Sequence, residues 1–270
     1  MGDTVVLVGC GNMGFAMLRG WLDSGALEPQ DIHVVEPAEA LRERAAGLGV
    51  HTVADAGALA SDLKPRMVLI AVKPQMMADV LPAYARFADA TFVSIAAGTP
   101  VALFEKLLGE KTAIMRVMPN TPAAIGKGML VTYRNANVTD ADAAFIAGLL
   151  ETSGEVASIA DESLMDAVTA VSGSGPAYVF HFIECLTDAG VAAGLDRTMA
   201  ELLARQTVYG AGALAAESQD SPSRLREQVT SPKGTTAAAL EVLMGEDRLK
   251  NLVTEAVEAA KKRSIELGKG

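Results

Sequence analysis

The 270-residue sequence has few cysteines, few aromatic residues and no long apolar segment. Its two cysteines, Cys10 and Cys185, are too few for a disulfide framework and lack metal-ligand spacing, so we expect buried thiols and no metal site. No apolar run approaches the roughly 18 residues of a membrane span, and the N-terminus has no signal-peptide pattern. These absences favour a cytoplasmic protein with no membrane partner.

Positive charge is also scarce, because 23 Lys and Arg face 33 Asp and Glu and the net charge is −10. A nucleic-acid partner requires a basic surface, so none is predicted. The three histidines, His33, His51 and His181, are scattered along the chain. No Ser-His-Asp or Cys-His constellation is visible, and structural roles are expected for all three.

The chain begins with an apolar run that leads directly into a G-x-G-x-x-G motif, residues 9–14. The run is typical of a strand buried on both faces of a parallel sheet. In such a strand–turn–helix unit Gly9 permits the tight turn, and Gly11 allows close approach of a pyrophosphate. Gly14 allows the helix to pack on the strand. The amides of Asn12 and Met13 would face the anion at the helix N-terminus.

A second apolar run ends in Glu36, 22 residues after Gly14. An acid at this spacing binds the adenosine ribose in dinucleotide-binding folds. Strand, motif, helix and acid together predict a dinucleotide site. The alternative is a glycine turn without a ligand.

Strands and helices alternate through the first 160 residues, which predicts an α/β domain, 1–160, with a doubly wound, mainly parallel sheet. The expected strands are Thr4–Val8, Ile32–Glu36, Thr52–Val53, Met67–Val72, Thr91–Ile95, Thr112–Val117, Met129–Tyr133 and Glu155–Ile159. The expected helices include Phe15–Trp21, Pro37–Gly47, Gln75–Ala85, one beginning at Pro100, and Thr139–Thr152.

After Asp161 apolar residues recur only at helical spacing, which predicts an all-α domain, 161–270. Its richness in alanine and glycine favours close packing and subunit contacts. Asp161, Asp196 and Asp247 precede expected helices and are able to cap them. The expected helices are Glu162–Val171, Pro176–Ala193, Arg197–Glu217, Ser223–Val229, Thr236–Met244 and Arg248–Leu267.

Ligands of open α/β sheets bind beyond the carboxyl ends of the strands. Lys73 is a candidate proton donor, a phosphate neighbour or simply a solvated loop lysine. Asn120 can offer its amide to a nicotinamide carboxamide or to substrate. The cofactor-binding candidates at these strand ends are Val72, Lys73, Pro74, Ala97, Gly98 and Asn120.

In the helical half, Ser231-Pro232-Lys233-Gly234-Thr235-Thr236 is a glycine-containing loop that opens a helix. Its backbone amides and hydroxyls suit a small carboxylate. The alternative is an ordinary capped helix start.

These segments together resemble the pyrroline-5-carboxylate reductase family over essentially the full length. The matching segments are Gly9–Gly14, Ala71–Gln75, Ser94–Gly98, Met118–Pro122, Ala170–Tyr178 and Val229–Thr236.

The resemblance implies reduction of 1-pyrroline-5-carboxylate to L-proline, the last step of proline biosynthesis, with hydride from NADPH or NADH. It implies an N-terminal Rossmann domain and a C-terminal helical domain that intertwines with a second subunit. The partners are the substrate and a homodimer mate, with a larger ring of dimers as an option. Ser231, Gly234, Thr235 and Thr236 would bind the substrate carboxylate, and Thr236, the catalytic candidate, would lie beside the ring nitrogen.

Two departures matter. Lys233 replaces the first of two glycines usual in that loop, at a cost of roughly 1–2 kcal/mol if the position needs a positive φ. Lys233 could instead add a cation near the substrate carboxylate. Glu36 occupies the place of a 2′-phosphate, which favours NADH at least as much as NADPH, unless Arg42 and Arg44 point inward.

Two other functions compete with this one. A β-hydroxyacid dehydrogenase shares the domain order but depends on a lysine in the helix that corresponds to Pro176–Ala193, where this chain has none. A non-catalytic dinucleotide-binding sensor would bind the cofactor and never oxidise it.

Overall fold

The computed structural model describes residues 3–268, and the chain divides into two compact units. The sheet unit comprises Met1–Ser174 with Ala260–Gly270, and the helical unit comprises Gly175–Ala259. The domains predicted as 1–160 and 161–270 stay a prediction.

The sheet unit is built on one eight-stranded sheet with the order β3-β2-β1-β4-β5-β6-β7-β8. Neighbours from β3 to β6 run parallel, β7 is antiparallel to β6, and β8 is parallel to β7. The predicted mainly parallel sheet is confirmed. The strands are β1 (Val5–Val8), β2 (Ile32–Val35), β3 (His51–Val53), β4 (Met67–Ile70), β5 (Thr91–Ser94), β6 (Ala113–Met118), β7 (Gly128–Arg134) and β8 (Gly154–Ser158).

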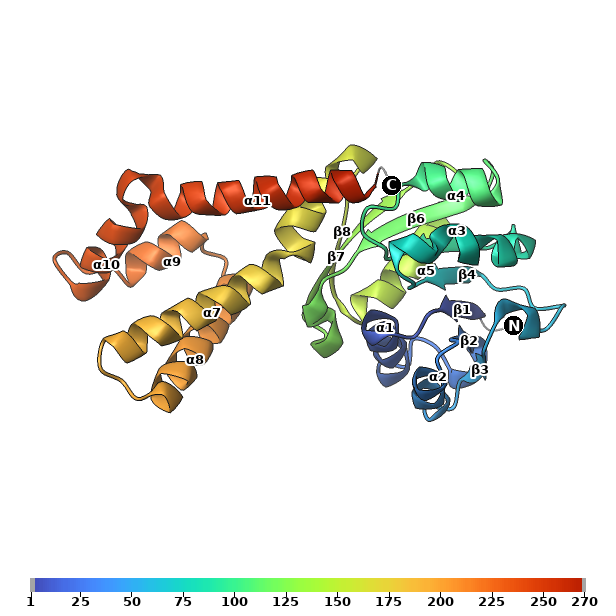
Figure 1. Cartoon of the computed structure of the whole chain (residues 1–270), viewed down its shortest axis with the longest axis horizontal. Coiled ribbons are helices and arrows are strands. Elements are labelled where there is room, and N and C mark those ends of the chain that lie inside the picture. Colours follow the sequence, from blue (N-terminus) through green and yellow to red (C-terminus); the bar gives the residue numbers. More distant parts are fainter. Residues whose placement is uncertain (1–2, 269–270) are drawn as a thin grey trace. The chain divides into compact units, whose positions relative to one another are not determined.

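Helices cover both faces of this sheet (Figure 1), which is why the central strands β1 and β4 consist of apolar residues without alternation. Val5 and Leu7 of β1 pack into one core with Trp21, and Val6 and Val8 pack into the other with Phe104. The first core is covered by α1 (Asn12–Asp23), α2 (Glu39–Ala46) and α5 (Asp140–Glu151). The second is covered by α3 (Met77–Val80), η4 (Leu81–Phe87) and α4 (Val101–Leu108).

Two expected helices are broken into short segments. In place of Gln75–Ala85 the chain forms η3 (Pro74–Met76), α3 and the 3₁₀ helix η4. Pro82 lies at the start of η4, where it has no N–H to continue an α-helical ladder. In place of Glu162–Val171 the chain forms η6 (Glu162–Leu164), α6 (Met165–Val168) and a π-helical turn, η7 (Thr169–Gly173).

The helical unit is all-α, as predicted. Two of the three predicted capping residues act as expected: Asp161, in the sheet unit, accepts from the Ser163 amide, and Asp196 accepts from the Met199 amide. Asp247 instead has a φ of 54° and pairs with Lys250. The helices are α7 (Gly175–Ala192), α8 (Arg197–Glu217), α9 (Pro222–Gln228), α10 (Thr235–Met244), the short η8 (Gly245–Asp247) and α11 (Arg248–Leu267), whose last residues belong to the sheet unit.

None of the helices among residues 3–268 combines the length and the apolar character needed to cross a membrane.

Candidate functional site: the cofactor cavity and the α10 loop

An open cavity of about 390 Å³ lies at the carboxyl ends of β1, β2 and β4. Five of the predicted cofactor-binding residues line it together: Gly9, Gly11, Glu36, Val72 and Lys73. The carboxyl edge of a parallel sheet is where this fold class binds its ligands. The cavity is therefore the candidate dinucleotide site.

The backbone geometry of the glycine motif explains its three glycines. Gly9 has a φ of +88°, and a Cβ there would lie 2.9 Å from the Ala71 carbonyl oxygen. A Cβ on Gly14 would lie 2.4 Å from the Gly9 carbonyl oxygen, so only glycine allows α1 to begin this close to β1. A Cβ on Gly11 would meet open space among the described residues, which leaves room for a pyrophosphate.

Glu36 follows β2 and is only 6% exposed. Its Oε2 accepts from the Cys10 amide at 2.7 Å, and its Oε1 accepts from the Ala38 amide at 2.9 Å. The carboxylate thereby fixes the first turn of the glycine motif and the chain after β2. Because each oxygen retains a lone pair, Glu36 can still accept a ribose hydroxyl.

Two arginines of α2 point toward the same loops, which answers the question that the sequence left open. Arg44 lies over the ring of Phe15 at 3.9 Å, and its Nη2 donates to the Cys10 carbonyl at 2.8 Å. Arg42 donates from Nη1 to the Glu36 carbonyl at 2.9 Å. Both guanidinium groups therefore bond to loops that border the cavity, although neither arginine lines it.

The thiol of Cys10 is inert by environment. Its side chain has no exposed surface, and burial raises the pKa of the thiol to about 11, with Glu36 adding a smaller rise and Arg44 opposing it. Cys10 remains protonated near neutral pH. Its burial confirms the expectation for this cysteine, whereas Cys185 is exposed, so the expected buried thiol is wrong there.

The other predicted cofactor residues lie outside the lining of this cavity. Asn12 and Met13 are the first two residues of α1, and Pro74 begins η3. Ala97 and Gly98 follow β5, where Gly98 has a φ of +70°. Their contacts with a cofactor stay a prediction.

Asn120 follows β6, and both ends of its side-chain amide bond to the protein itself. Nδ2 donates to the Ser172 carbonyl at 3.2 Å, and Oδ1 accepts from the Met129 amide at 2.9 Å. The contact of Asn120 with a nicotinamide stays a prediction.

Sequence reasoning missed several residues of the cavity wall, namely Asp55, Met76, Asp79 and Tyr84. Met76, Asp79 and Tyr84 lie on the broken helical segment between β4 and β5. Burial raises the pKa of the Tyr84 hydroxyl, with Asp55 adding to the rise, so this group stays protonated. The spacing of residues 76, 79 and 83–84 could have indicated a shared face toward the cavity, since residues three and four apart lie on one side of a helix.

The α10 loop, residues 231–236, closes a tight turn in the helical unit. The Gly234 amide donates to the Ser231 carbonyl at 3.0 Å, and α10 begins at Thr235. The turn directs the first amides of α10, including that of Thr236, toward the space in front of the helix. A helix N-terminus with free amides can bind an anion, and carboxylate binding by residues 231–236 stays a prediction.

Lys233 has a φ of 60°, one of three positive values at non-glycine residues in the described chain. The positive φ that strains a lysine is therefore present at this position. Its side chain is exposed and close in sequence to the predicted carboxylate-binding residues.

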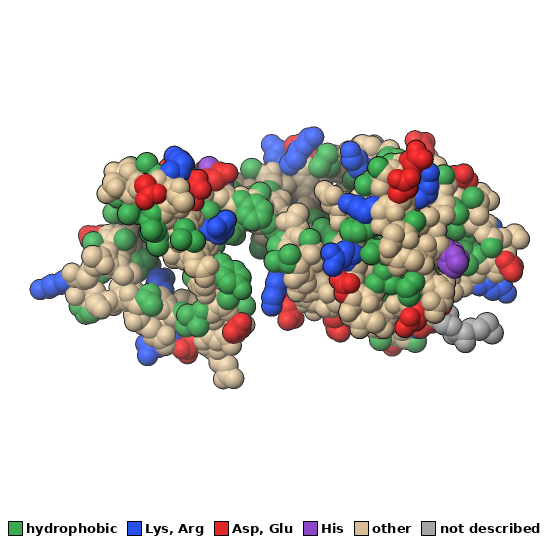
Figure 2. All heavy atoms as spheres, turned by 90° about the horizontal axis from the view of Figure 1, so that it is seen from below, with side chains coloured by type: hydrophobic (Ala, Val, Ile, Leu, Met, Phe, Trp, Pro, Cys, Tyr) green, Lys and Arg blue, Asp and Glu red, His purple; other side chains and the backbone are tan. Residues whose placement is uncertain are grey.

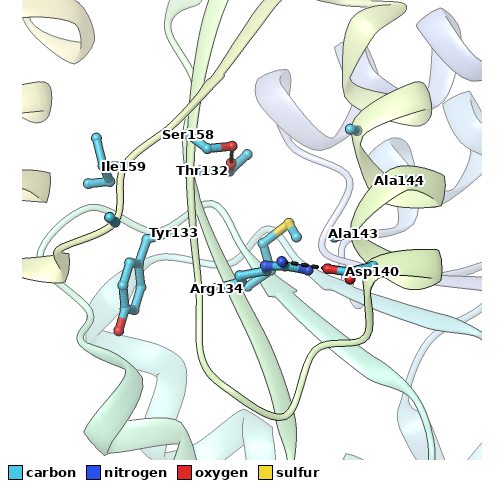
Figure 3. A pocket seen from close by; sticks show the side chains of 11 residues that line it. Thr132, Tyr133, Arg134, Asp140, Ala143, Ala144, Ser158 and Ile159 are labelled. Carbon is cyan, nitrogen blue, oxygen red and sulfur yellow. Dashed lines mark hydrogen bonds and ion pairs between the residues drawn. The ribbon is translucent and has the colours of Figure 1, made fainter.

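A second cavity, of about 510 Å³, lies at the carboxyl ends of β7 and β8, which is the edge where β6 begins (Figure 3). Arg134 and Asp140 form an ion pair at 2.6 Å on its wall, and the hydroxyls of Thr132 and Ser158 lie 2.8 Å apart. These four side chains already bond to one another within the cavity wall. Beside Gly11, by contrast, the first cavity has open space for a ligand. Among residues 3–268 no three His, Cys, Asp or Glu side chains are placed to hold a metal ion.

Two family models match the chain, one in each half. Residues 162–267 match the model described as pyrroline-5-carboxylate reductase dimerisation. Residues 4–98 match the model described as NADP oxidoreductase coenzyme F420-dependent. The two matches contain the two predicted parts of the site, residues 9–14 and residues 231–236.

Full-length relatives and solved structures are similar to the whole chain. It is 39% identical to pyrroline-5-carboxylate reductase of Pseudomonas aeruginosa, covering 97% of this chain and 96% of that protein. It is 40% identical to that of Synechocystis, covering 97% of each. The structure of a pyrroline-5-carboxylate reductase from Coxiella burnetii matches with a TM-score of 0.93 at 33% identity, covering 99% of each chain. One from Plasmodium falciparum with NADP bound matches with a TM-score of 0.85 at 30% identity, covering 99% of this chain and 98% of that one. The chain belongs to the pyrroline-5-carboxylate reductase family, as its motifs indicated.

Proposed function

We propose that this protein is an NAD(P)H-dependent reductase that converts 1-pyrroline-5-carboxylate to L-proline. The observation that carries the proposal is the full-length identity of 39% and 40% to reductases of that name. The similarity includes both the glycine motif and the α10 loop, so it covers both ends of the proposed site. A β-hydroxyacid dehydrogenase or a non-catalytic sensor would explain the glycine motif but not the α10 loop.

The residues present fit a dinucleotide. The cavity beside Gly9 and Gly11 is open, and the buried Glu36 lies at the carboxyl end of β2, where a ribose is expected. Gly9, Gly11, Asn12, Met13 and Gly14 would hold the pyrophosphate, and the loops after β4, β5 and β6 would hold the nicotinamide half. The bound cofactor supplies the hydride.

The chemistry requires positioning more than reactive side chains. A protonated cyclic imine is already electrophilic, so holding its imine carbon in contact with the hydride donor supplies most of the rate. Ser231, Gly234 and Thr235 would bind the substrate carboxylate. The hydroxyl of Thr236 would hydrogen-bond to the ring nitrogen, and the proton would come from Thr236 or from solvent.

NADH should serve at least as well as NADPH. Glu36 supports this, because a 2′-phosphate bound beside its buried carboxylate would be repelled. Arg42 and Arg44 act in the opposite direction, since both guanidinium groups reach the loops beside Glu36. Cofactor preference is measured by comparing kcat/KM for NADH and for NADPH. A preference for NADPH of about a hundredfold would contradict the proposal that NADH serves at least as well.

The active form is proposed to be a homodimer in which the α10 loop lies at a cofactor site of the assembly. The match of residues 162–267 to a dimerisation model supports this. A ring of dimers and a cytoplasmic location stay predictions. Light scattering on the purified protein measures the assembly.

The test of the function is an assay of cofactor oxidation with 1-pyrroline-5-carboxylate, run with NADH and with NADPH. L-proline is quantified in the same reactions. The proposal expects one proline per cofactor oxidised. A protein that binds either cofactor, detected by fluorescence titration, and oxidises neither would be a sensor.

A further inference from the structure

The loop after β6 is connected to the π-helical turn η7 by two side chains. Asn120 donates from Nδ2 to the Ser172 carbonyl at 3.2 Å and to the Ser172 hydroxyl at 3.4 Å. Met118, at the end of β6, contacts Gly173, because a Cβ on Gly173 would lie 2.4 Å from the Met118 terminal methyl carbon. The carboxyl end of β6 therefore touches the last two residues of η7.

The same asparagine also holds its own loop in place. Its Oδ1 accepts from the Met129 amide at 2.9 Å, at the beginning of β7. One side chain thus joins three segments: the loop after β6, the beginning of β7 and the turn η7. A side chain with bonds at both ends of its amide cannot move without breaking one of them.

The turn η7 has an unusual hydrogen-bond pattern and a significant position. The Ser174 amide donates to the Thr169 carbonyl at 2.8 Å, five residues back, so the turn is wider than an α-helix. Such π-helical turns are frequent at functional sites. The turn ends at Gly173, two residues before Gly175, which is the first residue of α7 and of the helical unit. The turn η7 is therefore the last helical segment of the sheet unit before the chain enters the helical unit.

We propose that Asn120 is a positioning residue that transmits the state of the cofactor loop to the beginning of the helical unit through η7. The loop after β6 lies at the ligand-binding edge of the sheet. Cofactor that orders this loop would order η7 through Asn120, and would prepare the helical unit for substrate. This proposal rests on the proposed function, and it assigns Asn120 a role other than contact with the nicotinamide.

The decisive variant is Asn120→Asp, which keeps the size and the acceptor Oδ1 but replaces the donor to Ser172 with an acceptor. Its matched control is Asn137→Asp, because Asn137 Nδ2 also donates to backbone carbonyls, those of Glu110 and Thr112, near the opposite end of β6. Asn120→Ala, which removes both bonds, provides a second variant if the aspartate does not fold.

The readout separates cofactor binding from turnover. For Asn120→Asp we expect a cofactor Kd within about twofold of wild type, and a loss of kcat/KM for the imine of about tenfold, the effect of losing one hydrogen bond. Hydrogen exchange should show slower exchange of the amides of residues 169–174 on adding NADP⁺ to wild type and to Asn137→Asp. The variant at Asn120 should lack this slowing.

Two results would overturn the proposal. A cofactor Kd that weakens as much as kcat/KM would make Asn120 a cofactor ligand. Exchange in η7 that responds to NADP⁺ equally in Asn120→Asp and in wild type would remove the connection. Failure of the proposed function is distinguishable, because wild type itself would then show no imine-dependent cofactor oxidation.

Discussion

The two units of this protein bury their apolar residues very differently. The sheet unit has two continuous cores, in which side chains as large as Trp21, Phe92 and Phe104 have no exposed surface. Within the helical unit only three residues are buried, Thr187, Ala200 and Ala204. Hydrophobic side chains are spread over its surface in Figure 2. Large apolar residues exposed there include Phe180, Tyr209, Val242 and Leu252.

This difference shows which half is complete within one chain. Exposed apolar surface of this extent marks an interaction site. Most soluble oligomers are symmetric assemblies of one chain, and two-fold dimers are the commonest of these. The cavity beside Gly9 and Gly11 is lined by residues of the sheet unit of one chain, whereas we expect a second copy to bury the apolar surface of the helical unit. The predictions below test that difference, beginning with the largest effect.

The first prediction breaks the helical surface with Leu252→Asp. Leu252 is 64% exposed in α11, and a charge placed there would be buried at a dimer interface without a partner. We expect the dimer Kd to rise by about a hundredfold or more, with loss of activity. Light scattering and the reductase assay measure both effects.

The control for this variant lies in the sheet unit. Ile125 is 77% exposed in η5 (Thr121–Ile125), and Ile125→Asp should leave the dimer intact. A dimeric, active Leu252→Asp protein would show that the helical surface has another purpose.

The second prediction concerns Thr236→Ala. If the hydroxyl bonds to the ring nitrogen, its removal should lower kcat by about a hundredfold with little change in Tm. Thr236→Ser keeps a hydroxyl and should retain most of the activity. Kinetics of Thr236→Ala equal to those of wild type would remove this residue from the mechanism.

The third prediction uses the strained backbone at Lys233. Because its φ is 60°, Lys233→Gly should raise the free energy of unfolding by about 1 kcal/mol. Urea unfolding measures this change. Lys233→Gln removes the charge and keeps the strain, so it should give no gain in stability.

The kinetics of the same two variants show what the charge does. If the Lys233 ammonium attracts the substrate carboxylate, both variants should raise KM for the imine by a similar factor, and added salt should reduce the difference from wild type. A stability gain in Lys233→Gln equal to that in Lys233→Gly would contradict the backbone explanation.

The smallest effect concerns Cys10 in the sheet unit. Burial raises the pKa of its thiol to about 11, above the ordinary value of 9.0. The folded protein therefore holds this proton more tightly than the unfolded chain. The resulting stability is fully present below pH 9.0 and is lost as the pH rises from there through about 11.

Iodoacetamide labelling tests this environment, with the modified cysteine identified by mass spectrometry. At pH 8 Cys10 should react in urea and resist modification in the native protein. Equal rates of Cys10 labelling in native and unfolded protein would contradict the buried, protonated thiol.

The sequence predicted the elements whose pattern is local. β1 and β4 were recognisable because both faces are buried, so their residues form continuous apolar runs. Glu36 was recognisable by its distance from Gly14. The aspartates at 161 and 196 were recognisable as caps, because a cap acts within three residues of itself.

The features that the sequence missed depend on contacts between distant segments. The π-helical form of η7 accompanies contacts with Met118 and Asn120, about fifty residues earlier, which no periodicity records. The inward direction of Arg44 depends on Phe15 and on the Cys10 carbonyl. Pro82 is present in the sequence and disfavours a continuous α-helix. The apolar spacing nevertheless predicted a helix that runs through it.

The central claim is that the α10 loop of the helical unit completes a cofactor site built on the glycine motif of the sheet unit. A crystal structure of the assembly with NADP⁺ and L-proline tests it most directly. The account predicts proline with its carboxylate at the amides and hydroxyls of residues 231–236, and its ring against a nicotinamide. A structure in which those residues lie far from every nicotinamide of the assembly would contradict it.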